Sequence, residues 1–347
     1  MSVKEKRQEL VSTLFPGGIP RLWCPLLTHY REDISIDIPR MKAHFHHIVP
    51  WVKGYLMPGS TGDGWELNRE ESMEVMEFAL QMARENDAHV LLGVLKPDAD
   101  TMKRTIDEML QRLQGLTEIK DIMNCLVSAH VCGFTVTPPT GESLDQKIIH
   151  RDLSQIIEKE LPIALYQLPQ ITHNEMAPET FEQLVQKYSN VILFKDSSGH
   201  DRIALADIDP GDVYLVRGAE GDYAKWLKDA GGRYDGFLLS TANCFPSQLM
   251  AVIEHIENGD LKSARELSRR LTTVINNVFE LVQPVPIGNA FTNANKAMDH
   301  YYAFGETAAE RKGPMLHGGI HLSADIIIAT GEILVKYDLM PEKGYLE

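Results

Sequence analysis

The sequence predicts an α/β protein whose fold is a (β/α)8 TIM barrel with additional C-terminal helices. Two observations predict this fold class. Short apolar runs alternate with longer amphipathic stretches, and eight such runs can be counted, the number of strands in a closed parallel barrel. A doubly wound open sheet alternates in the same way, so the periodicity alone leaves the closure of the sheet undecided.

The candidate strands are short apolar runs with helical segments between them. They are Leu22–Leu27, Gly54–Met57, Val90–Val94, Gly133–Thr137, Ile163–Tyr166, Val191–Lys195, Val213–Arg217 and Gly236–Leu239. The clearest helix begins at Asn68, which we predict to be the N-cap of a capping box closed by Glu71. A stripe of apolar residues at spacings of three and four predicts that one face of this helix packs on the core. The stripe consists of Met73, Met76, Leu80 and Ala83.

We divide the chain into three parts. Residues 1–20 form an N-terminal extension, residues 21–247 the barrel, and residues 248–347 a helical region that packs on the barrel rather than forming a second domain. Predicted helices in the last part are Leu261–Leu281 and Ile320–Tyr337. No Ser/Gly-rich linker, repeat or low-complexity tract interrupts the chain.

The charge of the chain excludes two classes of partner. Its formal net charge of -15 argues against nucleic acid and anionic membranes, because both bind clustered Lys and Arg side chains. No apolar run reaches the length that spans a bilayer, and the charged N-terminus lacks the apolar core of a signal peptide. The four cysteines form no Cys-x-x-Cys pair, which favours a reducing compartment over a zinc site or disulfide framework. We therefore expect a cytoplasmic protein.

In a (β/α)8 barrel, function lies where strands end and loops begin, and four strand ends carry unusual residues. The sixth strand ends at Lys195, within the segment Phe194–Gly199. Desolvation favours the neutral, nucleophilic form of a lysine amine. On strand position alone, however, a lysine that extends its amine to solvent is the better interpretation. The other three ends are the segments 58–64, 165–169 and 239–243, which read PGSTGDG, LYQLP and LSTAN.

Taken in order, these motifs resemble the dihydrodipicolinate synthase / N-acetylneuraminate lyase family of class I, Schiff-base aldolases. The resemblance runs from about Arg21 to Ala264. It implies a (β/α)8 fold and a cofactor-free, metal-free reaction on a small-molecule 2-oxo acid such as pyruvate. It also implies a homo-oligomer, either a dimer or a tetramer.

The resemblance assigns a role to each matching residue. Lys195 is the Schiff-base lysine, whose iminium acts as an electron sink, and Tyr166 shuttles protons because its hydroxyl both donates and accepts. Ser60 and Thr61 bind the substrate carboxylate. The further substrate-binding residues are Gly59 and Gly62 in the same turn, and Gly218, Glu220 and Ser240 after the seventh and eighth strands.

Two departures from the family pattern bear on the reaction. Pro138 and Pro139 stand where condensing members carry a Tyr-Tyr pair, and Ile171 stands where the lysine-biosynthesis enzyme has an arginine. These differences argue against strict dihydrodipicolinate synthase activity and leave aldol cleavage, aldol condensation and sugar-acid dehydration open. The altered loop Pro138–Glu142 lies where the family's dimer contact is expected.

Two alternatives to a Schiff-base enzyme remain open. The first is a catalytically silent family member that acts as a 2-oxo-acid sensor or scaffold. The second is an unrelated barrel that binds a metal or phosphate, although the sequence offers no ligand cluster with a recognised spacing. We interpret His44, His46 and His47 as a solvated or half-buried helix face, and His317 as structural.

Overall fold

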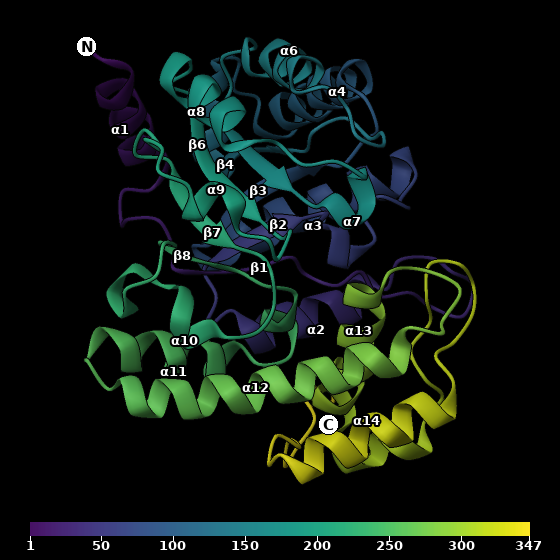
Figure 1. Cartoon of the computed structure of the whole chain (residues 1–347). Coiled ribbons are helices and arrows are strands. Elements are labelled where there is room, and N and C mark those ends of the chain that lie inside the picture. The colour runs from purple at the N-terminus through teal and green to yellow at the C-terminus, as the bar shows by residue number, and fades with distance from the viewer.

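The computed structural model describes all 347 residues, and its eight parallel strands form one closed barrel. The strands pair in sequence order, and β1 pairs with both β2 and β8, which closes the sheet (Figure 1). The (β/α)8 barrel is therefore confirmed, and the open-sheet alternative is wrong. The strands are β1 Leu22–Cys24, β2 Gly54–Met57, β3 His89–Val94, β4 Val131–Val136, β5 Ile163–Gln167, β6 Val191–Asp196, β7 Tyr214–Arg217 and β8 Gly236–Leu238.

Helices connect the strands, and the last four α-helices make up the C-terminal region. The α-helices are α1 Val3–Leu14, α2 Ile38–Ile48, α3 Arg69–Asn86, α4 Ala99–Thr117, α5 Ile122–Ser128, α6 Gln146–Ile157, α7 Pro169–Thr172, α8 Pro178–Lys187, α9 Arg202–Leu205, α10 Tyr223–Trp226, α11 Pro246–Glu257, α12 Leu261–Val282, α13 Ala290–Phe304 and α14 Ala324–Lys336. The short 3-10 helices are η1 Ser60–Gly62, η2 Lys228–Ala230, η3 Ser240–Asn243 and η4 Gly305–Glu310.

A layer of apolar side chains fills the barrel interior, and every strand contributes to it. Because side chains alternate across a strand, the residues on either side of each layer member face the surrounding helices. The layer consists of Trp23, Leu56, Leu91, Cys132, Ala164, Leu193, Val216 and Leu238, none more than 1% exposed. This layer fixes which residues at the strand ends point into the barrel mouth.

Some strand boundaries differ from the prediction. Strand β1 ends at Cys24 instead of Leu27, and the next residue, Pro25, has no N–H to continue the ladder. Strand β4 begins at Val131, before the predicted start at Gly133, where the register with β3 shifts. Both changes leave the predicted strand order intact.

The helix predictions are mostly confirmed. Asn68 caps α3, and the capping box with Glu71 is present. The predicted helix at 320–337 starts only at Ala324, because Met315 and His321 pair in an antiparallel bridge and Ser323 is the N-cap. Helix α13 has no counterpart among the predicted elements.

The C-terminal helices lie against the barrel and against one another. Helix α12 contacts α11, α13 and α14, and α13 also contacts η1 and η3 at the ends of β2 and β8. In Figure 1 the long α12 runs below the barrel, with α14 beneath it. This arrangement brings residues beyond 289 to the barrel mouth.

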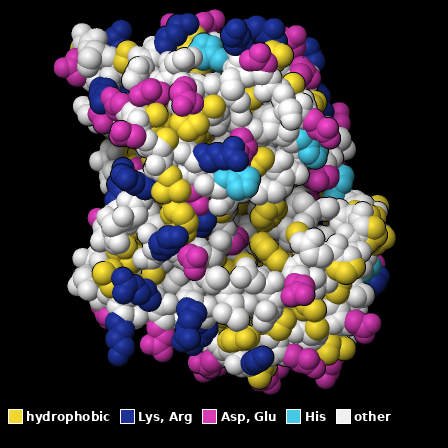
Figure 2. Space-filling view, viewed as in Figure 1, with side chains coloured by type: hydrophobic (Ala, Val, Ile, Leu, Met, Phe, Trp, Pro, Cys, Tyr) yellow, Lys and Arg dark blue, Asp and Glu magenta, His cyan; other side chains and the backbone are white.

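The face shown in Figure 2 carries acidic and basic side chains interspersed, and apolar side chains gather over the C-terminal helices. On α14, Ile328 and Val335 are 46% and 63% exposed. No helix of the structure combines the length and apolar character needed to cross a membrane.

Helix α1 closes the other end of the barrel, where Leu14 and Phe15 pack beneath the interior layer. Its Arg7 is fully buried and donates hydrogen bonds to backbone carbonyl oxygens beside the start of β6. The acceptors are Val185 at 2.5 Å, Tyr188 at 2.7 Å, Val191 at 2.6 Å and Gly211. Arg7 thus anchors the first residue of the strand that carries Lys195.

We expect Arg7→Met to lower the free energy of unfolding by about 3 kcal/mol, because several buried carbonyl oxygens lose their donor. Urea unfolding followed by circular dichroism measures the change. Lys4→Met on the same helix is the control, since Lys4 forms only an exposed ion pair with Asp209 and its loss should have no measurable effect. Equal losses in the two variants would contradict the anchoring role of Arg7.

Candidate active site

Strand alternation places four of the predicted site residues one layer above the interior apolar layer. Two residues after Leu193 comes Lys195, and two residues after Ala164 comes Tyr166, so both point into the barrel mouth. By the same count, Gly218 follows Val216 on β7 and Ser240 follows Leu238 on β8. The strand period therefore brings together residues that are far apart in the sequence.

Lys195 and Tyr166 are direct neighbours. They are register partners across β5 and β6, and the Lys195 Nζ lies 4.1 Å from the centroid of the Tyr166 ring. Both side chains are buried, at 3% and 2% exposure. The lysine therefore does not extend into solvent, which removes the alternative that strand position alone favoured.

The Tyr166 hydroxyl faces the turn at the end of β2. Its oxygen lies 3.3 Å from the Ser60 Oγ, which also accepts a hydrogen bond of 2.9 Å from the Trp65 Nε1. Because the indole N–H only donates, the Ser60 hydroxyl keeps its own proton for another acceptor. Tyr166 thus lies between the other two residues, with its ring beside the Lys195 amine and its hydroxyl beside that of Ser60.

The turn that carries Ser60 and Thr61 is a single 3-10 turn in a fixed position. Gly62 is required here, because a Cβ at this position would overlap the Leu26 carbonyl oxygen. Gly59 precedes the turn in extended conformation with φ -97° and ψ 174°. The two glycines support the turn, whereas Ser60 and Thr61 present their side chains.

One small cavity unites these groups. It is lined by Ser60, Thr61, Tyr166, Leu168, Lys195, Ser197, Gly218, Ser240 and Phe291, and about 10 Å³ is open to the centre of a water molecule. That volume holds about one water. A Cβ at Gly218 would overlap the Ser197 Oγ and lie 2.7 Å from the Lys195 Cε, so glycine leaves room for the lysine side chain.

Glu220, unlike the other predicted residues after β7 and β8, does not line the cavity. Its carboxylate accepts hydrogen bonds from the Ser240 Oγ at 2.6 Å and from the Tyr223 hydroxyl at 2.8 Å. The Thr241 Oγ1 at 2.7 Å and the Thr241 N–H at 3.1 Å also donate to it. The carboxylate oxygens are therefore occupied by the loop that presents Ser240.

Comparisons with known proteins find similarity to one family. A sequence model described as the "Dihydrodipicolinate synthetase family" matches residues 131–300. Over these residues the chain is similar to the dihydrodipicolinate synthetase family. The resemblance seen in the motifs is confirmed, and the match extends beyond Ala264 to include most of α13. The Ser60–Thr61 turn lies outside the matched residues.

Individual relatives can be aligned with most of this chain. The 4-hydroxy-tetrahydrodipicolinate synthase of Methanococcus aeolicus is 24% identical over 273 residues, 78% of this chain and 87% of its own. That of Dichelobacter nodosus is 25% identical over 287 residues, 82% of this chain and 89% of its own. The crystal structure of YagE, an E. coli prophage protein of the family in complex with pyruvate, superimposes with a TM-score of 0.72 at 20% identity, covering 92% and 99% of the two chains. The protein thus has the class I aldolase-type fold of the dihydrodipicolinate synthetase family.

Phe291 is a cavity residue that sequence reasoning missed. It comes from α13. The apolar residues of this helix recur at helical spacing and could have predicted it; they are Ala294, Ala297, Met298 and Tyr301. Nothing in that spacing shows that the helix reaches the barrel mouth. Leu168 and Ser197, by contrast, lie within motifs that the sequence already singled out.

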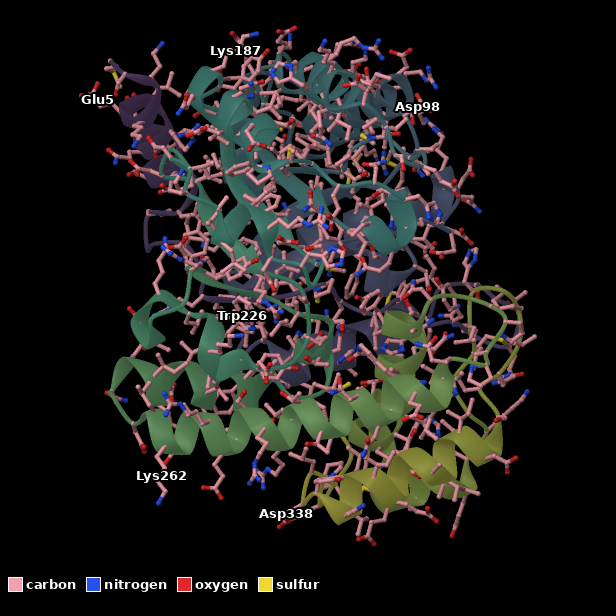
Figure 3. The ribbon with its side chains drawn as sticks, in the orientation of Figure 1. Glu5, Asp98, Lys187, Trp226, Lys262 and Asp338 are labelled. Atoms are coloured by element: carbon pink, nitrogen blue, oxygen red, sulfur yellow. The ribbon has the colours of Figure 1, made fainter.

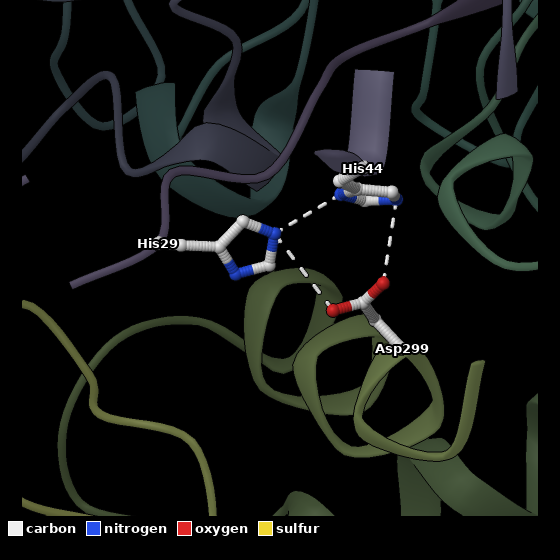
Figure 4. Close-up of side chains that lie close together, drawn as sticks. All are labelled: His29, His44 and Asp299. Carbon is white, nitrogen blue, oxygen red and sulfur yellow. Dashed lines mark hydrogen bonds and ion pairs between the residues drawn. The ribbon is translucent and has the colours of Figure 1, made fainter. Parts of the chain in front are cut away.

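The histidine interpretation is wrong for His44. This side chain is fully buried, with Nε2 2.8 Å from the Asn243 carbonyl oxygen and Nδ1 3.0 Å from the His29 Nε2 (Figure 4). Because a carbonyl only accepts, the His44 Nε2 carries a proton. His46 is exposed and His47 half-buried, as predicted.

Asp299 completes this buried cluster, and imidazole and carboxylate groups are the ligands that zinc prefers. Here, however, the carboxylate accepts hydrogen bonds from Arg40 at 3.0 Å and Tyr345 at 2.9 Å. Burial, aided by the nearby Arg40 charge, holds the pKa of His29 well below its usual range, so this imidazole is neutral. A metal cation would lie against the Arg40 guanidinium. The cluster fits a hydrogen-bond network better than a metal centre.

A second buried network lies directly behind Lys195. Arg217 forms two hydrogen bonds of 2.9 and 3.1 Å with the Asp201 carboxylate, which also accepts one of 2.6 Å from Tyr234. The Arg217 guanidinium packs 4.2 Å from a ring of Trp226, which Figure 3 shows between the barrel and the C-terminal helices. Asp196, the residue after Lys195, accepts only one strong hydrogen bond, from the Ser198 N–H at 2.9 Å. Desolvation raises the pKa of Asp196 to about 6.

This pKa predicts a pH-dependent stability. The folded protein binds the Asp196 proton more tightly than the unfolded chain does, and this tighter binding adds to the free energy of unfolding. The added stability is complete below about pH 4 and is lost as the pH rises through 6. We expect Asp196→Asn, which stays neutral, to gain about 3 kcal/mol of unfolding free energy relative to the wild type between pH 4 and pH 7. Urea unfolding at both pH values measures it. The control is Asp338→Asn at an exposed position (Figure 3), for which the difference from wild type should not change with pH. A constant difference for Asp196→Asn would contradict the prediction.

Proposed function

We propose that the protein is a cofactor-free class I lyase or aldolase that forms a Schiff base between Lys195 and pyruvate or a related 2-oxo acid. The observation that carries this proposal is the placement of Lys195 beside Tyr166 and the Ser60–Thr61 turn in one buried cavity. The similarity to the dihydrodipicolinate synthetase family supports it. The relatives from Methanococcus aeolicus and Dichelobacter nodosus carry the name of an enzyme, 4-hydroxy-tetrahydrodipicolinate synthase.

The chemistry begins at the lysine. The neutral Lys195 amine attacks the ketone carbon, water leaves, and the protonated imine draws electrons from the adjacent carbon. In this proposal Ser60 and Thr61 donate hydrogen bonds to the carboxylate and hold the ketone against the amine. Tyr166, which lies between the lysine and Ser60, moves the protons that imine formation and release require.

Three reactions share this imine: aldol cleavage, aldol condensation and dehydration of a sugar acid. Strict dihydrodipicolinate synthase activity is not proposed, because apolar groups surround the place where its second carboxylate would bind. Ile171 packs against the Tyr166–Leu168 cluster together with Trp65 and Phe291. An unpaired carboxylate there would be desolvated without a cationic partner.

A second candidate function is that of a catalytically silent 2-oxo-acid sensor or scaffold. The observation that favours it is that Pro138 and Pro139 stand where condensing members carry a Tyr-Tyr pair. A sensor forms the imine without turnover. A panel of aldehydes and sugar acids distinguishes it from the enzyme.

The decisive experiment is reductive trapping. Wild-type protein incubated with pyruvate and borohydride should gain the mass of one reduced pyruvate, located by peptide mapping at Lys195. Lys195→Ala should lose the adduct, because no other amine lies in the cavity, whereas a variant of the exposed Lys187 (Figure 3), Lys187→Ala, should keep it. Tyr166→Phe should lower turnover by about a hundredfold or more, since proton transfer is lost. No adduct with any small 2-oxo acid would refute the Schiff-base proposal.

Phe291 should limit the size of the 2-oxo acid. In Phe291→Ala the cavity wall recedes, and we expect trapping of 2-oxobutanoate to improve about tenfold relative to pyruvate, the usual worth of one methylene in a tight pocket. The matched control is Phe279→Ala, because Phe279 packs on Phe291 with ring centroids 5.7 Å apart but does not line the cavity. The measurement is the ratio of half-saturating concentrations for the two acids. An unchanged ratio in Phe291→Ala would show that another group sets the size limit.

A further inference from the structure

Helix α13 holds the Ser60–Thr61 turn from behind. The Thr292 Oγ1 lies 3.2 Å from the Ser60 carbonyl oxygen and 3.0 Å from that of Thr61. The Asn289 Nδ2, at the N-cap of the helix, also donates to the Ser60 carbonyl oxygen at 3.2 Å. The backbone of the two residues proposed to bind the carboxylate is thus attached to a helix more than 200 positions later in the chain.

A buried ion pair fastens the next part of the same turn. The Lys296 Nζ lies 3.0 Å from the Asp63 Oδ2, and the two side chains are only 1% and 2% exposed. Asp63 also accepts a hydrogen bond of 2.9 Å from the Tyr30 hydroxyl, and the lysine Nζ lies 4.4 Å from the centroid of that ring. A charge buried this deeply stays in place only with its partner.

These contacts form one stripe on α13. Asn289, Thr292 and Lys296 are spaced by three and four residues, so they lie on the same face of the helix. None of the three lines the cavity, whereas Ser60 and Thr61 do. The stripe therefore acts on the cavity through the turn, not through contact with a substrate.

We propose that Thr292 and Lys296 are positioning residues that hold the Ser60–Thr61 turn in the geometry that binds a carboxylate, so that α13 gives the site its preference for 2-oxo acids over carbonyl compounds without a carboxylate. This inference rests on the proposed Schiff-base function. Lys195 is held separately, by β6 and its pairing with β5. Loss of the stripe should therefore weaken capture of the carboxylate and leave attack by the amine intact.

The test compares pyruvate with acetaldehyde. Both have a methyl group on the carbonyl carbon that the amine attacks, but acetaldehyde has no carboxylate. For each, borohydride trapping at Lys195 is followed by peptide mass spectrometry against concentration. In Thr292→Val, an isosteric change that removes only the hydroxyl, the half-saturating pyruvate concentration should rise about fivefold, and that of acetaldehyde should stay unchanged. The matched control is Thr105→Val, whose hydroxyl donates to the Thr101 carbonyl oxygen on α4, outside the cavity.

Lys296→Met should raise the half-saturating pyruvate concentration further. Because it leaves Asp63 buried without its partner, the double variant Asp63→Asn/Lys296→Met tests the same contact without an unpaired charge. If neither protein folds, Thr292→Val decides. Equal shifts for pyruvate and acetaldehyde, or no shift for pyruvate, would overturn the positioning role. A wild-type protein that traps neither compound would refute the Schiff-base proposal itself, and the inference with it.

Discussion

Strand alternation in a closed barrel is the constraint on which the site depends. Once Leu193 and Ala164 fill the interior, the residues two positions later must point into the mouth, and these are Lys195 and Tyr166. The register between β5 and β6 then makes them direct neighbours, with no further device needed to bring them together. A slip of one residue in β6 would turn the lysine toward the helices and Asp196 into the cavity. The anchoring of Val191 by Arg7 at the opposite end of β6 opposes such a slip.

The sequence predicts what depends on local pattern. Apolar runs and capping residues located the eight strands and α3, and the ordered motifs located Lys195, Tyr166 and the Ser60–Thr61 turn. What it does not predict depends on contacts between distant segments. His44 is buried against Asp299 and Tyr345, and Phe291 lines the cavity, but the residues next to His44 and Lys195 in the sequence indicate neither contact. In the sequence His44 resembles an exposed polar position on a helix, and in the structure the C-terminal segment covers it.

Helix α13 connects these unpredicted features. Phe291 enters the cavity, Thr292 and Lys296 hold the turn after β2, and Asp299 joins the cluster of His29 and His44. Successive turns of one helix therefore contact the cavity, the turn that supports it and the buried network beside η3. A barrel that ended at β8 would have the lysine and the tyrosine but not this outer wall. The C-terminal region is part of the site as well as of the fold.

The same contacts bear on the electrostatics of the proposed anion site in a chain with a net charge of -15. No carboxylate lines the cavity. Glu220 accepts hydrogen bonds from three hydroxyls and an N–H, whereas Asp63 is paired with Lys296 and Asp201 with Arg217. Buried pairs of this kind cancel most of their field at the distance of the cavity, whereas the exposed acidic groups are screened by solvent and salt. The cavity is lined by one amine, a row of hydroxyls and an apolar wall, so the carboxylate of the proposed substrate would meet no carboxylate of the protein there.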